Sequence, residues 1–271
     1  MNQPSILVVG SANVDLVTRV SRSPRPGETI TGLSFHIYPG GKGANQAVAA
    51  ARLGARTVFA GCVGADEFGA MQRQTLAEAG VDVSYIKTEP DEATGTASIL
   101  VADGGENTIV VAPGANGRIT PADIERLDGL FAEMDVVLLQ LEVPLDTVEA
   151  ALDAARKHGA LSILDAGPAQ QLPSSLLAKA SIVSPNETEA QALTGLPVGS
   201  LEEARVAADA LRTLGAPEVV LKLGARGTLY VGDETLYAPA FPVKAIDTVA
   251  AGDWFTAALG YAWRTMPGKM E

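Results

Sequence analysis

The sequence predicts an α/β fold with a mainly parallel central sheet, helices on both of its faces and a small additional β-sheet. Three observations predict it. Short apolar runs such as 5–10 alternate with longer amphipathic stretches such as 144–158. The apolar runs are continuous, as is typical of parallel strands buried on both faces. Two segments, 14–38 and 94–111, break the alternation and have the pattern of strands joined by turns.

The strands expected in the central sheet are the short apolar runs, and the first of them ends at a glycine. They are 5–10, 57–60, 135–141, 161–164, 181–183 and 218–223. The expected helices begin at acidic residues, proline or N-cap side chains, and several stop at a glycine that can adopt positive φ. They are 43–53, 66–79, 144–158, 187–193, 201–214 and 252–263.

Residues 96–101 and 108–111 flank a polar, glycine-containing segment and predict a hairpin. We expect the segments 14–38 and 94–111 to pair into a small lid over the active-site edge. The domain expectation is therefore one α/β domain spanning 1–271 with this lid inserted in it. In parallel sheets ligands bind at the carboxyl ends of the strands, which directs attention to the loops there.

Composition excludes several classes of protein. Lys and Arg number 20 against 32 Asp and Glu, so the net charge is −12, which opposes binding to nucleic acid or to anionic membranes. One cysteine permits no internal disulfide, and two distant histidines argue against a structural zinc site. No apolar run is long enough to cross a bilayer, and the first residues lack signal-peptide features. We expect a cytoplasmic protein.

Two glycine- or turn-containing segments lie in the first fifth of the chain. Asn13 and Asp15 follow the first strand two residues apart and can face the same way, which suits vicinal hydroxyls; the alternative is a polar turn. Residues 39–46 place three glycines at a helix start, where polar or anionic groups are favoured; the alternative is a purely structural helix start. This segment is neither a Walker A loop nor a complete dinucleotide fingerprint, because Gln46 replaces the third glycine.

Two further segments open helices later in the chain. Asn186 and Glu189 have the spacing of a capping box, or could hold a hydrated Mg²⁺. Residues 247–253 form a small-residue turn before a helix, and the N–H groups of such a turn can bind an anion. Asp253 beside that anion could accept a proton from an alcohol attacking a phosphate; the alternative is an ordinary acidic first turn.

Together the four segments resemble the PfkB family of carbohydrate kinases over about 6–259. The strings GGKGANQA and DTVAAGD carry the resemblance, and PNETEA, LGARG, GEN and PGAN add to it. The resemblance implies the ribokinase-like fold, a three-layer sandwich with a small β lid that often forms a homodimer contact. It implies transfer of the γ-phosphate of ATP to a sugar hydroxyl with Mg²⁺ and a monovalent cation, K⁺, as activator. The most similar members act on D-ribose and form ribose 5-phosphate, so ribose and ATP are the expected partners.

The resemblance also implies roles for individual residues. Asp253 corresponds to the general base, with the anion hole formed by the N–H groups of Ala250, Ala251 and Gly252. The sugar-binding set comprises Asn13, Asp15, Gly41, Lys42, Asn45, Glu142 and Asp253. The nucleotide-binding set comprises Asn186, Lys222, Gly224 and Gly227. Glu189 is expected to bind Mg²⁺ through water, and Asp247 with the carbonyl of Val249 to bind the monovalent cation.

Four departures from the family pattern qualify these roles. Lys222 and Ala225 stand where small hydroxyl residues are common, and Trp254 stands where a small Thr is usual. The chain also ends sooner after the base than family members do, which leaves open whether the adenine pocket and the cation site are complete. The alternatives left open are a kinase for another sugar or nucleoside and a truncated sugar-binding protein with weak or no turnover. A dinucleotide-dependent oxidoreductase is opposed by the incomplete glycine fingerprint.

Overall fold

The structure is a computed structural model that describes residues 3–243 and 248–266. Nine strands of this part form one sheet in the order β13-β12-β11-β10-β9-β8-β1-β4-β5. Neighbours from β11 to β5 are parallel, whereas β12 and β13 add an antiparallel edge. The strand bounds are β1 (Ser5–Val9), β4 (Arg56–Gly64), β5 (Asp82–Glu89), β8 (Val136–Leu139), β9 (Leu161–Asp165), β10 (Ile182–Ser184), β11 (Glu218–Lys222), β12 (Thr228–Val231) and β13 (Thr235–Ala238).

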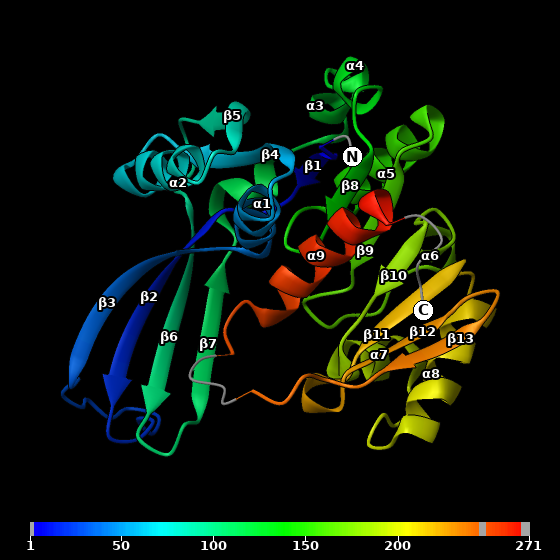
Figure 1. Ribbon diagram of the computed structural model, residues 1–271. Helices are drawn as coiled ribbons and strands as arrows, with labels where there is room; N and C mark the ends of the chain where they lie inside the picture. The colour runs from blue at the N-terminus through cyan, green and yellow to red at the C-terminus, as the bar shows by residue number, and fades with distance from the viewer. Residues whose placement is uncertain (1–2, 244–247, 267–271) are drawn as a thin grey trace.

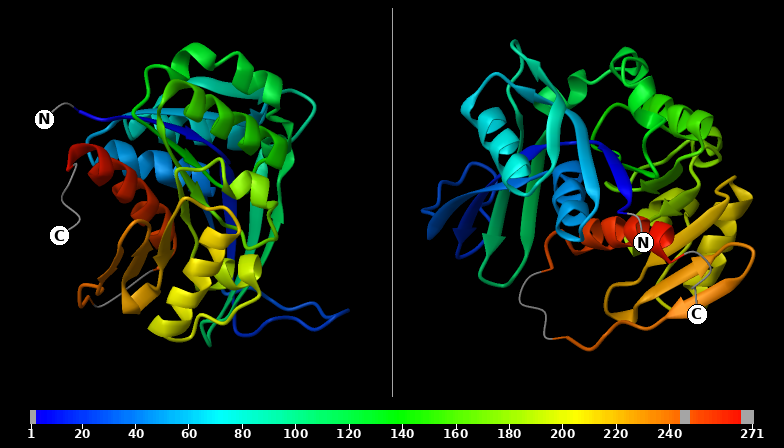
Figure 2. Two further views of the ribbon diagram at one scale, coloured as in Figure 1. Left: turned by 90° about the vertical axis from the view of Figure 1, so that its right-hand side faces the viewer. Right: turned by 45° about the horizontal axis from the view of Figure 1, so that its top comes forward.

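Helices cover both faces of this sheet. On β1, Ile6 and Val8 pack with the apolar residues of α1, α2 and α9, and Leu7 and Val9 pack with those of α3 to α8. Both faces are therefore buried, which explains the continuous apolar runs. Figure 2 shows α1 and α9 side by side in both views. The helix bounds are α1 (Lys42–Arg52), α2 (Glu67–Glu78), α3 (Pro121–Glu125), α4 (Asp128–Phe131), α5 (Leu145–His158), α6 (Ser174–Leu177), α7 (Glu187–Thr194), α8 (Leu201–Thr213) and α9 (Ala251–Thr265), with 3₁₀ turns at Gly114–Arg118 and Gly224–Arg226.

A second sheet lies beside the first, with strand order β3-β2-β6-β7 (Figure 1). Its strands are β2 (Asn13–Val20), β3 (Ser34–Gly40), β6 (Gly95–Ala102) and β7 (Asn107–Ala112). β2 pairs antiparallel with β3 and parallel with β6. The two lid segments, 14–38 and 94–111, are thereby joined in one sheet. A mainly parallel sheet between helical layers, with a separate small sheet, confirms the predicted fold class.

The two sheets flank the beginning of α9, which starts between the four-stranded sheet and the strands β10 to β13 (Figure 1). The carboxyl ends of β1, β8, β9 and β11 and the first turns of α1 and α9 supply the side chains that meet there. In the part of the chain that is described, no helix is long and apolar enough to span a membrane.

Candidate active site

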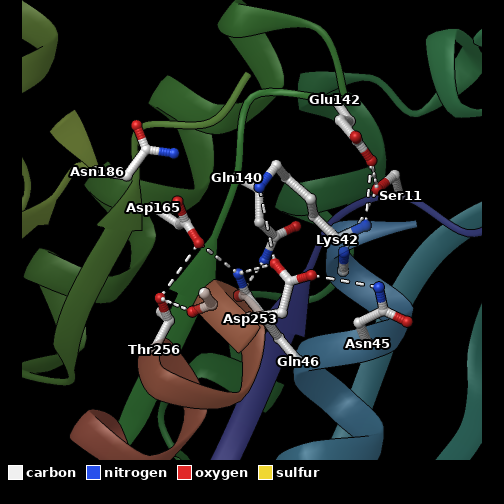
Figure 3. Close-up of polar contacts among 12 residues, drawn as sticks. Ser11, Lys42, Asn45, Gln46, Gln140, Glu142, Asp165, Asn186, Asp253 and Thr256 are labelled. Atoms are coloured by element: carbon white, nitrogen blue, oxygen red, sulfur yellow. Dashed lines mark hydrogen bonds and ion pairs between the residues drawn. The ribbon is translucent and has the colours of Figure 1, made fainter. Parts of the chain in front are cut away.

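Asp253 lies in the first turn of α9 and is only 5% exposed. Its Oδ2 accepts a hydrogen bond of 3.2 Å from Asn45 Nδ2, and its Oδ1 lies 3.8 Å from Lys42 Nζ. Burial raises the pKa of this carboxyl to about 6, while the Lys42 ammonium opposes the increase. Lys42 and Asn45 from α1 thus converge on Asp253 from α9, as Figure 3 shows.

The glycines before and within α1 allow its first turn to approach the β1–β2 connection closely. A Cβ on Gly43 would lie 2.6 Å from Ser11 N, and one on Gly41 would lie 2.6 Å from Asn13 N. Gly41 also has a φ of 91°, which side chains rarely adopt. These glycines serve close backbone packing, and that packing fixes where Lys42 enters the site.

Polar side chains from β2 and the β8–α5 loop line the side of the site next to the lid. Glu142 Oε2 accepts hydrogen bonds from Ser11 Oγ at 2.5 Å and from Lys42 N at 3.1 Å. Asn13 Nδ2 lies 3.4 Å from the same oxygen. Burial raises the pKa of Asp15 to about 6, and the negative charge of Glu142 adds to the increase. Together with Asp253 and Asn45, these residues give three carboxylates and two amides that can face one polyhydroxylated ligand.

A chain of buried side chains connects this region with the opposite side. Gln46 Nε2 donates to Asp165 Oδ2 at 3.0 Å and lies 3.4 Å from Asp253 Oδ1. Asp165 Oδ2 also accepts from Thr256 Oγ1 at 3.2 Å, and Asp165 Oδ1 pairs with Lys222 Nζ at 3.0 Å. Gln46 and Asp165 are both completely buried. The Asp253 carboxylate thus belongs to a hydrogen-bonded network rather than standing alone.

Asn186 and Glu189 form a complete capping box at the start of α7. Asn186 Oδ1 accepts from Glu189 N at 2.9 Å, and Glu189 Oε2 accepts from Asn186 N at 2.7 Å. The second oxygen of Glu189, Oε1, lies on the same side of Gly167 as the Lys42 ammonium. A Cβ on Gly167 would lie 2.5 Å from Glu189 Oε1 and 2.8 Å from Lys42 Nζ. Burial raises the pKa of Glu189, and Asp165 raises it further. The capping interpretation is confirmed and leaves one carboxylate oxygen directed at the site.

The turn that begins α9 has an unusual backbone. Ala250 has a φ of 59° and is the non-glycine residue with positive φ in the described ranges. Ala251 N donates to Thr248 O at 3.3 Å, whereas the N–H groups of Ala250 and Gly252 have no acceptor among the described residues. Left-handed backbone next to helical backbone turns successive N–H groups in one direction, which is how anion-binding turns are built.

Comparison with known proteins identifies the family. A model of the pfkB family of carbohydrate kinases matches residues 3–269. The chain belongs to the PfkB family. The Ribokinase of Haemophilus influenzae is 42% identical over 252 residues, covering 93% of this chain and 82% of that protein. The Deoxyribokinase of Salmonella typhi is 38% identical, covering 92% of this chain and 82% of that protein.

A solved structure of a relative has the same fold as this kinase. The structure of Arabidopsis thaliana ribokinase complexed with ribose and ATP matches with a TM-score of 0.89 and 34% identity. The match covers 98% of this chain and 87% of that one. This chain is therefore a PfkB carbohydrate kinase with the ribokinase-like fold.

In this PfkB kinase most residues predicted from the sequence lie around one centre. Asp253 meets Lys42 and Asn45 directly, and Asn13 and Glu142, which are predicted to bind the sugar, contact each other. On the opposite side Lys222 reaches the network through Asp165. Gly224 and Gly227 bound the 3₁₀ turn after β11, with φ values of 55° and 99°. A Cβ on Gly227 would overlap Ala238 O, so this glycine also serves close packing.

The predicted monovalent cation site is described only in part. Asp247 lies outside the described residues, and Val249 is a surface residue of the turn before α9. The proposed role of the pair as cation ligands remains a prediction.

Sequence reasoning missed the buried residues that link the two sides of the site, Gln46, Gln140, Asp165 and Thr256. A signal was present for Asp165, because it is the last residue of a parallel strand, where ligand-contacting side chains gather. Gln46 lies inside the glycine-rich motif but was considered only as a departure from a dinucleotide fingerprint. Asn116 was also missed as a positioning residue. Its Nδ2 donates to Asn13 Oδ1 at 2.7 Å.

Proposed function

We propose that this kinase transfers the γ-phosphoryl group of ATP to the 5-hydroxyl of D-ribose, with Asp253 as general base. The observation that carries the proposal is the buried Asp253 carboxylate at the start of α9, held by Asn45 and facing Lys42. A base whose pKa is raised to about 6 is still ionised at neutral pH and accepts a proton better than an ordinary carboxylate. The O–H bond of ribose breaks towards Asp253 as the new O–P bond forms, and the bond between the γ-phosphorus and the β–γ bridging oxygen breaks, so that ADP leaves.

The phosphoryl group would be stabilised by charge and position rather than by covalent chemistry. The N–H groups of Ala250 and Gly252, without acceptors among the described residues, support an anion hole next to Asp253. Lys42 lies between the sugar-side and phosphate-side carboxylates, which raise the pKa of its ammonium although burial alone would lower it. Asn186, Lys222, Gly224 and Gly227 are the proposed nucleotide contacts.

Glu189 suits Mg²⁺ bound through water. One of its oxygens is used by the capping box, and the other is directed at the site beside Lys42. No cluster of three or more His, Cys, Asp or Glu side chains in the described ranges could hold a metal by itself. Mg²⁺ commonly has few protein ligands and several from water and phosphate, so one carboxylate fits it. The ion would neutralise phosphate charge there. K⁺ at Asp247 and Val249 is proposed from the family resemblance.

Relatives support ribose and raise one competing sugar. The Haemophilus relative is named a ribokinase, and the Arabidopsis structure contains ribose and ATP. The Salmonella typhi relative is named a deoxyribokinase, which makes 2-deoxyribose the second candidate acceptor. A coupled assay with ATP, Mg²⁺ and K⁺ against ribose, 2-deoxyribose, hexoses and nucleosides tests the proposal. A higher kcat/KM for any sugar other than ribose would contradict it.

Sugar binding without turnover is the remaining alternative. Calorimetry with ribose and with a non-hydrolysable ATP analogue separates it from the kinase, because a sugar-binding protein would bind the first and not the second.

We also propose that the four-stranded sheet contacts a second copy of the chain. Its apolar side chains Phe35, Ile37 and Val110 are 55%, 44% and 65% exposed.

A further inference from the structure

Lys222 and Asp165 form a buried ion pair at the edge of the site. Lys222 ends β11 and Asp165 ends β9, and the two strands flank β10. Their side chains are 11% and 0% exposed, and Lys222 Nζ lies 3.0 Å from Asp165 Oδ1. Because an unpaired charge is very unfavourable at such a depth, the two residues depend on each other.

Asp165 is held rigidly by its other contacts. Its Oδ2 accepts hydrogen bonds from Gln46 Nε2 and Thr256 Oγ1. Gln46 extends from α1 and Thr256 from α9, so the carboxylate is fixed to both helices that meet at the base. The ammonium of Lys222 is therefore held in a defined position relative to Asp253.

That position is next to the beginning of α9. A Cβ on Gly252 would lie 3.8 Å from Lys222 Nζ, which places the ammonium close to one residue of the proposed anion hole. An ammonium has three N–H donors, and among the described residues only Asp165 accepts from this one. The unused donors therefore lie near a residue whose backbone N–H has no acceptor among the described residues, as a site for an anion requires.

We propose that Lys222 contacts the phosphoryl group during its transfer and that Asp165 is the positioning residue that holds Lys222 there. This inference rests on the proposed kinase function and assigns Lys222 to the transferred group rather than to the rest of the nucleotide. An ammonium fixed in advance stabilises charge that develops on the phosphoryl oxygens without having to reorganise. The competing interpretation is that Lys222 only neutralises Asp165.

The decisive variants are Lys222→Met and the double variant Asp165→Asn/Lys222→Met. We expect Lys222→Met to lower kcat by about 10²–10³-fold, with KM for the sugar within about twofold of wild type. The affinity for a non-hydrolysable ATP analogue should fall about tenfold, whereas ADP, which lacks the transferred group, should bind as before. The double variant removes both buried charges together, so it should melt near wild type and remain as slow as Lys222→Met.

Lys157→Met is the matched control, because Lys157 forms a surface pair with Asp128 away from the site. Turnover of Lys222→Met within about threefold of wild type, recovery of turnover in the double variant, or an equal loss of ADP and ATP-analogue affinity would each overturn the inference. If wild type binds no ATP analogue, the proposed function itself fails and the inference falls with it. If wild type binds the analogue without turnover, the difference between analogue and ADP still decides the role of Lys222.

Discussion

Gln140 Nε2 donates a hydrogen bond of 2.6 Å to Gln46 Oε1, and both side chains are completely buried. This contact fixes which end of the Gln46 amide is the oxygen, so that its Nε2 is directed at Asp165 and Asp253. Gln140 directly follows strand β8, so this contact links the central sheet to the amide that is held against Asp253.

The first prediction follows from this contact. Gln140→Leu should lower kcat by between about threefold and a hundredfold, because the amide of Gln46 is then free to turn and the base is less precisely placed. KM for the sugar should change little. The substitution leaves the buried Gln46 Oε1 without its donor but also removes Gln140 Oε1, which has no hydrogen-bond partner among the described residues, so the melting temperature should fall only modestly. Gln74→Leu on the surface of α2 is the control, and an unchanged kcat in Gln140→Leu would contradict the positioning role.

Asp253→Asn tests the base. We expect kcat to fall about 10²–10⁴-fold, the usual contribution of a positioned proton acceptor. Calorimetry should still detect sugar binding, because the amide preserves the shape of the side chain and can still contact Asn45. Asp128→Asn, a surface change, should keep full activity. If Asp253→Asn retained turnover near that of wild type, the assignment of the base would be wrong.

The raised pKa values predict how activity depends on pH. Asp253 and Asp15 both have a pKa of about 6, so kcat/KM should rise from pH 5 to about 7 and then level off. The ordinary value is 3.8, so between about pH 4 and 6 the folded chain binds more protons than the unfolded chain at these two carboxyls. Their contribution to the free energy of unfolding therefore falls as pH rises through that window. Rate profiles and chemical denaturation at each pH measure the two effects, and an acidic limb centred near pH 4 would disagree with both.

Gly43 and Gly129 form a matched pair for testing the packing of α1. A Cβ on Gly43 would lie 2.6 Å from Ser11 N, whereas nothing lies within 4 Å of one on Gly129 in α4. Gly43→Ala should lower the free energy of unfolding by about 1–3 kcal/mol or more, because the added methyl group overpacks the contact with Ser11. It should also shift Lys42 and Asn45. Gly129→Ala should be neutral or stabilise by about 0.5–1 kcal/mol. Thermal melting of both variants checks this, and equal effects would exclude the close-packing explanation.

The lid prediction concerns the oligomeric state. The strand register aligns Ile37 with Leu16, Ser98 and Val110, so these side chains share one face of the sheet. A carboxylate on that face would oppose pairing, and Val110→Glu should convert a dimer into a monomer in sedimentation measurements. Val206→Glu on the exposed side of α8 is the matched control. A monomeric wild type would contradict the proposed contact.

Much of the fold could be predicted because buried parallel strands and capped helices leave strong local signals. The run at 161–164 became β9 (Leu161–Asp165), and Gly159 ends α5 with a φ of 73° as expected. The strands β5, β12 and β13 were not predicted. β5 and β13 are edge strands, whose exposed polar residues obscure the pattern, and β12 has only 4 residues. The short helices α3, α4 and α6 give too few residues for a periodic signal.

Site residues could be predicted where they belong to a sequence motif with a typical chemical role. Residues that only hold those side chains in place could not be predicted. Lys42, Asn45 and Asp253 lie in recognisable strings, and the structure brings them together. Asp165 and Gln140 have no motif of their own, and their roles depend on contacts 57 and 94 residues away in the sequence. Lys222 was placed on the nucleotide side from the sequence, but its partner could not be identified without the strand order.

The hydrogen bond between Asn45 and Asp253 joins residues 208 positions apart. During synthesis on the ribosome, the lid, α1 and the strands β1, β4, β5, β8 and β9 emerge well before α9, and they can pack before Asp253 is translated. Helix α1 must then leave the surface that α9 will cover open to solvent, so the Ala-rich face of α1 is a point where a nascent chain is vulnerable to aggregation. A chain whose synthesis has not yet reached α9 lacks the proposed base, so we expect it not to consume ATP.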